Sequence, residues 1–268
     1  MKISRRATLT TSILLAGGLA LTGCSSPAAP ADGGSSTSQE APAKGGALTQ
    51  DNFAQRIADA QFAAGSVHMS MQMGDSVEGS IEADMVIDKD PKKIQMQMTM
   101  DQAGVKGDIR LVDGKMYMNM GPLSGDKFFD MSTMPGGAGD IGAILDQVNP
   151  GSQVEGFGDA LTDFVADPNG PEIDGVKTTQ LTLTLDTRKM FEAQGPQEGV
   201  DIDTLVSTLG ESMVYDMFIG SDDLPRRIVM PNVGGMGTGT QEYTKWGEPV
   251  KIEAPAKDQI ADASALQG

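Results

Sequence analysis

The stretch Met96-Gln97-Met98-Thr99-Met100 decides the fold of this chain. Methionine alternates with a polar residue, and the pattern recurs at residues 69–73 (MSMQM) and 116–120 (MYMNM), so these three runs contain half of the 18 methionines. Successive side chains of a β-strand point to opposite faces of a sheet. The alternation therefore predicts three strands, each with one face lined by methionine.

Strand-like alternation continues around these runs. Residues 77–88 and 105–112 place apolar side chains on one face and polar ones on the other. The Asp113-Gly114 pair is a strong signal for a tight hairpin turn. Residues 67–131 therefore predict a meander of about six antiparallel strands, with one apolar face and one polar face.

The second half of the chain mixes strands with short helices. Strands are expected at residues 176–186, 213–219, 225–230 and 241–246. Helices are expected at residues 48–64, 141–148, 154–164, 187–193 and 202–209. The whole predicts an α+β domain: a strongly curved antiparallel sheet of about ten strands, or half-open β-barrel, with short helices covering its concave face.

The N-terminus has the features of a bacterial lipoprotein signal peptide. Positive charges in residues 2–6 precede a short apolar run, and Leu21-Thr22-Gly23-Cys24 resembles a lipobox, in which the peptide is cut before the cysteine and the thiol takes a diacylglycerol. We therefore expect lipidation of Cys24 and a location on the extracytoplasmic face of the cell membrane; the export route stays open between the general and twin-arginine pathways. The predicted divisions are 1–23 (signal peptide), 24–46 (lipidated Cys24 and a flexible tether), 47–253 (folded domain) and 254–268 (polar C-terminal tail).

Composition excludes several classes of function. The formal net charge is −17, which repels the phosphates of nucleic acids. With one cysteine and one histidine, the chain can form neither an internal disulfide nor a zinc site built from Cys and His. No catalytic motif stands out, so we expect a protein that is not an enzyme and has neither a cofactor nor a resident metal. We also expect a monomer.

The layout resembles the mycobacterial LppX/LprG-type lipoproteins and the wider LolA-like envelope carriers. The resemblance rests on the lipobox with its tether, on the hairpin at residues 112–117 leading to 127–129, on the segment 222–228 (DDLPRRI), and on the ending 243–252 (YTKWGEPVKI). It implies a half-open barrel whose concave face holds acyl chains. It also implies a role in moving or presenting lipids or lipoglycans in the cell envelope.

Three interpretations of the methionine face stay open: an ordinary core, a lipid pocket, and a copper(I) site of thioether ligands. We expect the lipid pocket, closed by helices at 139–164 and 201–210; the alternative function is a structural or sensory lipoprotein that binds another protein. The candidate pocket residues are Met69, Met71, Met73, Ile81, Met85, Met96, Met98, Met116, Met118, Ile144, Leu145, Leu161, Phe164, Leu181, Leu183, Leu205 and Met217.

Overall fold

The computed structural model describes residues 46–72, 79–102, 104–133, 149–150, 158–193, 201–230 and 237–261. All the elements below belong to one unit of residues 40–268. The N-terminal strands are β1 (Ser66–Gln72), β2 (Gly79–Val86), β3 (Gln95–Gln102), β4 (Val105–Val112), β5 (Lys115–Asn119) and β6 (Phe129–Asp130). The C-terminal strands are β7 (Leu161–Asp167), β8 (Glu172–Ile173), β9 (Val176–Asp186), β10 (Ser212–Gly220), β11 (Pro225–Met230) and β12 (Gly239–Thr244).

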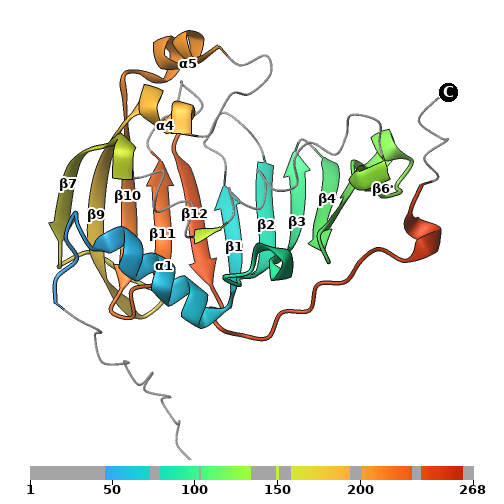
Figure 1. Ribbon diagram of the computed structural model, residues 1–268, viewed down its shortest axis with the longest axis horizontal. Helices are drawn as coiled ribbons and strands as arrows, with labels where there is room; N and C mark the ends of the chain where they lie inside the picture. The colour runs from blue at the N-terminus through green and yellow to red at the C-terminus, as the bar shows by residue number, and fades with distance from the viewer. Residues whose placement is uncertain are drawn as a thin grey trace, which may run out of the picture. The chain divides into compact units, whose positions relative to one another are not determined.

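These twelve strands form one open antiparallel sheet with the order β6-β5-β4-β3-β2-β1-β12-β11-β10-β9-β7, and β8 pairs with β9 (Figure 1). The N-terminal meander and the C-terminal strands meet where β1 pairs with β12. The predicted α+β curved sheet is therefore confirmed, with two strands more than expected. The hairpin between β4 and β5 turns at Asp113 and Gly114, whose φ values of 52° and 71° are those that an Asp-Gly turn of this kind requires.

Strand β7 corrects the prediction of a helix over residues 154–164. Residues 158–160 are helical, but Leu161 begins a strand that runs to Asp167. The register on β9 shifts between Leu161 and Asp163, so a β-bulge places Leu161 opposite Leu185 and Phe164 opposite Leu183. A bulge adds one residue to a strand and so puts residues three apart on the same face, which imitates the spacing of a helix.

Helix α1 (Phe53–Ala64) lies across one face of the sheet (Figure 1). It begins later than the predicted residue 48, because the Thr49 amide donates to the side chain of Asn52 and residues 50–52 form a turn. Its buried residues include Phe53 and Ile57, one helical turn apart. Gly65 ends the helix in the left-handed conformation, at φ 75°, where a residue without a Cβ is favoured.

Two short helices, α4 (Thr187–Ala193) and α5 (Ile202–Leu209), pack on each other at the end of β9 (Figure 1). Both have the bounds that the sequence predicts, and Asp201 caps α5 by accepting a hydrogen bond from the Asp203 amide. Short 3-10 turns complete the described structure: η1 (Pro91–Lys93), η2 (Gly121–Ser124), η3 (Met131–Thr133) and η5 (Lys257–Gln259).

The segment after Glu253 packs against the sheet as far as Ala261. The Phe128 amide donates to the carbonyl of Gln259, and the Ala261 amide donates to the carbonyl of Phe128. The Arg110 guanidinium lies 4.8 Å from the centre of the Phe128 ring and donates to the carbonyl of Glu253. These contacts hold the segment beside β6, so this part of the expected polar tail belongs to the folded domain.

Candidate functional site

One face of the sheet, called here the apolar face, is defined by cross-strand rows of residues in register. One row runs Leu181, Met217, Ile228, Gln241, Met71, Ile81 and Met100, from β9 to β3. A second row runs Tyr243, Met69, Ala83, Met98, Ile109, Met118 and Phe129, from β12 to β6. A third row runs Val67, Met85, Met96, Leu111 and Met116. Met69, Met71, Met96, Met98, Met100, Met116 and Met118 of the three methionine runs thus belong to a single surface.

No Asp, Glu, Lys or Arg occurs among the residues paired on the apolar face along the described path from β6 to β7. The reverse face, called here the polar face, holds the charges. His68 lies there, as the alternation predicts, with Nδ1 2.8 Å from Asp84 Oδ1 and Nε2 3.1 Å from Glu82 Oε2. The two carboxylates thus contact different nitrogens of the imidazole ring, and the three groups do not point toward a common centre. No cluster of His, Cys, Asp and Glu in the described part of the chain has the arrangement of a metal site.

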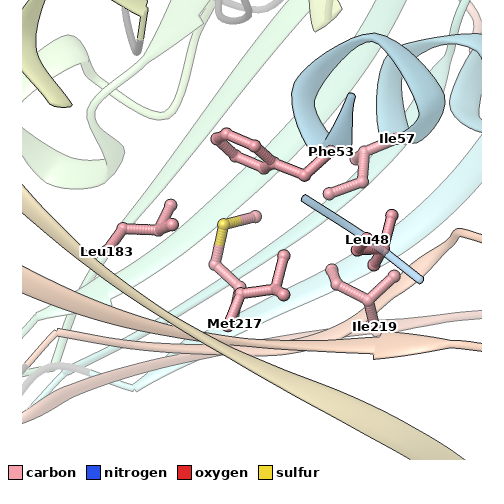
Figure 2. Packing of buried hydrophobic residues seen from close by; sticks show 7 residues of the cluster. Leu48, Phe53, Ile57, Leu183, Met217 and Ile219 are labelled. Carbon is pink, nitrogen blue, oxygen red and sulfur yellow. The ribbon is translucent and has the colours of Figure 1, made fainter. Parts of the chain in front are cut away.

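Helix α1 covers one half of the apolar face. Phe53 and Ile57 pack against Leu183, Met217 and Ile219 of β9 and β10, and Figure 2 shows these side chains directed toward one another. The Phe53 ring lies 5.1 Å from that of Phe164 on β7. Leu181, Leu183 and Ile219 have no exposed surface. This half is therefore a close-packed core.

A small cavity remains beneath α1. It measures about 60 Å³ and lies among Ile57, Ala58, Met217, Ile228 and Tyr243. A cavity of this size holds a few water molecules and is too small for an acyl chain. A larger open hollow of about 460 Å³ has the charged residues Glu82, Asp101, Lys106 and Asp108 among its lining residues, together with Met100.

The other half of the apolar face, from β1 to β5, is only partly enclosed. Met96 and Met116 are buried, and Met96 belongs to a small cluster with Ile94 and Leu111. The remaining methionines paired on this surface, called here the methionine wall, are half-buried: Met69, Met71, Met85, Met98, Met100 and Met118. Long, unbranched methionine side chains adapt to ligands of irregular shape.

Polar side chains on the apolar face include Gln241, Tyr215 and Tyr243. The amide nitrogen of Gln241 donates to the sulfur of Met69. The Tyr215 hydroxyl has two sulfur partners, Met190 at 3.6 Å and Met213 at 3.9 Å. The Tyr243 hydroxyl has no hydrogen-bond partner among the described residues. Burial raises the pKa of the Tyr243 phenol, and it also raises the pKa of the Tyr215 phenol.

The segment 222–228 holds α1 against the sheet. Asp223 accepts two hydrogen bonds from the guanidinium of Arg56, which also donates to the carbonyl of Gly46 at 2.6 Å. Arg226 pairs with Asp222 at 2.6 Å and braces the same turn. The sequence marks this segment as part of the family resemblance but does not show that its function here is to position a helix.

Trp246 holds the ring of Tyr243 in position. The two rings stack with their centres 5.9 Å apart, and the indole nitrogen of Trp246 donates to the Pro225 carbonyl at 2.9 Å. This contact links the end of β12 to the start of β11. Sequence reasoning missed Gln241 and Tyr243 as members of the apolar face; the available signal was the spacing 241, 243, which alternates with the charged Glu242.

The structure brings together most of the predicted pocket residues. Leu161, Phe164, Leu181, Leu183 and Met217 belong to the half under α1, whereas Ile81 lies with the methionine wall. Leu205 is half-buried on α5, which packs on α4 at the strand ends. Met73, Ile144, Leu145 and Cys24 lie outside the described residues. The same holds for most of the predicted lid at 139–164, while its residues 161–164 form part of β7.

Comparison with solved structures identifies proteins of similar fold. No known protein family matches the sequence, and no curated protein matches it. Among solved structures, LprF from Mycobacterium bovis is 18% identical, with a TM-score of 0.50 over 77% of this chain and 97% of that one. The Mycobacterium tuberculosis lipoprotein LppX is 16% identical, with a TM-score of 0.51 over 76% of this chain and 98% of that one. No helix among the described residues is long and apolar enough to cross a membrane. The resemblance seen in the motifs is therefore confirmed as a shared fold with these mycobacterial lipoproteins.

Proposed function

We propose that this protein is a cell-envelope lipoprotein that binds an acylated lipid or lipoglycan on the methionine wall and does not catalyse a reaction. The observation that carries the proposal is the half-buried state of Met69, Met71 and Met98 on a face without charges. Partly accessible methionine side chains on an uncharged face suit an apolar partner of irregular shape. The shared fold with the lipoproteins LppX and LprF supports an envelope function.

The ligand's chains would lie on the wall and not beneath α1. The core under α1 is close-packed, and its cavity of about 60 Å³ has no room for a chain. On the wall, each buried methylene would contribute about 0.8 kcal/mol to binding. Helix α1 thus forms a fixed boundary for the site, held by the ion pair between Arg56 and Asp223.

The uncharged face also supports a role without catalysis. General acids, bases and nucleophiles are titratable side chains placed within hydrogen-bonding distance of the reacting group. In the described part of the apolar face, only the two tyrosine phenols titrate, and burial raises the pKa of each. Such a surface suits reversible binding and transfer of a lipid.

The N-terminal anchor would keep the protein at the membrane. A diacylglycerol on Cys24 supplies two acyl chains, which give stable attachment, and the tether of residues 25–46 lets the domain reorient. The formal net charge of −17 becomes −20 when residues 1–23, with Lys2, Arg5 and Arg6, are removed, and this negative charge would repel the domain from an anionic membrane surface. The domain would then exchange lipids while remaining outside the headgroup layer.

Lipid extraction tests the proposal. The full chain is purified after expression in a bacterium that makes its own envelope lipids, and the extract is analysed by mass spectrometry. We expect acylated species at close to one per protein, beyond the mass of the covalent anchor. A protein free of non-covalent lipid, with a protein partner that co-purifies in equal amount, would support the alternative of a protein-binding lipoprotein.

A further inference from the structure

Strand β12 carries two polar side chains at the middle of the apolar face. Gln241 lies opposite Ile228 on one side and Met71 on the other, and Tyr243 lies opposite Met69. Strand β12 joins the half that α1 covers to the methionine wall. Both residues therefore stand where the closed half of the face meets the partly open half.

Neither side chain has a strong hydrogen-bond partner in the described part of the protein. Gln241 donates to a thioether sulfur, which is a weak acceptor, and the Tyr243 hydroxyl has no partner there. Gln180 on the polar face provides a contrast, since its amide donates to Asp216 Oδ1 at 3.1 Å. Polar groups in apolar surroundings are stabilised when a better acceptor reaches them.

Contacts within the protein fix the positions of Gln241 and Tyr243. The Tyr243 ring stacks on Trp246, whose indole is fixed by its hydrogen bond to Pro225, and Tyr243 also lines the small cavity beside α1. Gln241 is held in the centre of the sheet between two paired strands. A ligand group that reaches them meets two donors that lie two residues apart on the same face of β12.

The residues around Gln241 and Tyr243 favour a neutral ligand over a charged one. No charged residue is paired on the apolar face from β6 to β7, so the position offers a phosphate or carboxylate no counter-ion there. A carbonyl accepts hydrogen bonds without bringing charge. We propose that Gln241 and Tyr243 hydrogen-bond the carbonyl of a neutral acyl-ester or acyl-amide linkage, while the attached chains extend along the methionine wall. This inference rests on the proposed function and names the class of lipid bound.

The test compares two lipids that differ only in this linkage. The full chain, freed of bound lipid, is loaded with a pyrene-labelled acyl probe, and displacement is measured with 1,2-dioleoylglycerol and with its dialkyl ether analogue, which lacks the carbonyls. We expect wild type to prefer the ester by about 3- to 10-fold, the size of one net hydrogen bond. Gln241→Leu and Tyr243→Phe should each remove most of this preference by weakening ester binding, with ether binding unchanged.

Gln180→Leu is the matched control, because it removes a glutamine from the polar face of the same sheet, and it should keep the preference. Thermal unfolding followed by circular dichroism checks that each variant folds. Equal binding of the two lipids by wild type, or equal losses for both lipids in Gln241→Leu and Tyr243→Phe, would overturn the assignment and leave lipid binding intact. If neither lipid displaces the probe from wild type, the assignment and the proposed function both fall.

Discussion

Arg56 on α1 and Asp223 in the turn between β10 and β11 form a two-pronged ion pair: Nε lies 3.1 Å from Oδ2, and Nη2 lies 2.6 Å from Oδ1. The carboxylate is buried and the turn residue that bears it has a φ of 65°. The pair is a polar contact that ties the helix to the turn between β10 and β11. The position of α1 in turn decides where the methionine wall begins.

Removal of this ion pair should destabilise the fold. Arg56→Ala leaves the Asp223 carboxylate buried without its guanidinium, and we expect the free energy of unfolding to fall by about 1–3 kcal/mol in urea titrations followed by circular dichroism. Arg188→Ala, which breaks an exposed pair with Asp203, is the control and should change stability little. Equal effects of the two variants would show that the Arg56 pair does not hold α1.

The two halves of the apolar face should respond differently to truncation. Leu183→Ala opens a cavity in the close-packed half, so we expect a loss of about 2–5 kcal/mol in the free energy of unfolding. Met98→Ala removes a half-buried side chain and should cost a smaller amount, about 1–2 kcal/mol. If Met98→Ala costs as much as Leu183→Ala, the methionine wall is a core and not a binding surface.

A charge on the methionine wall should abolish lipid uptake. Met98→Glu places a carboxylate among Ala83 and Ile109, where bound chains would have to desolvate it. The control is Gln97→Glu, which adds the same charge on the polar face opposite Arg110. Displacement of a pyrene-labelled acyl probe should detect no binding to Met98→Glu and unchanged binding to Gln97→Glu. Parallel losses would mean that net charge alone governs uptake.

Stability should fall in alkali through the partly buried phenols of Tyr215 and Tyr243. Burial raises the pKa of Tyr243 and of Tyr215 above the usual 10.0, so each contributes stability that is fully present below pH 10 and is lost as the pH rises toward its folded-state pKa. Unfolding free energies measured from pH 8 to 11.5 should drop less steeply for Tyr243→Phe than for wild type. Identical slopes would show that the Tyr243 phenol is freely solvated.

The anchor gives a simple prediction. Cys24→Ala removes the thiol that would carry the diacylglycerol, so the protein should move from the membrane fraction to the soluble fraction of a bacterial lysate. Mass spectrometry of the wild-type protein should show a lipid-modified N-terminus that begins at Cys24. Membrane attachment that persists in Cys24→Ala would mean that another part of the chain binds the membrane.

Local patterns predicted most elements of this fold. The alternation around Met98 and Leu183 gave the strand bounds to within a few residues, because the side-chain period of a strand is a property of a few consecutive residues. The same reasoning failed at Leu161 and Phe164, where a bulge gave a strand the spacing of a helix. It also passed over Gln241 and Tyr243: their spacing around Glu242 places both on one face of a strand, but no local pattern shows that this strand pairs with β1.

The sequence alone predicts most of the strands, the two faces of the sheet, and the placement of methionine on one face, because all three depend on residue spacing. The tertiary structure decided that Gln241 meets Met69, 172 residues away, and that α1 closes only one half of the apolar face. Strand order and helix position depend on backbone pairing and ion pairs between distant segments, which no short stretch of sequence encodes.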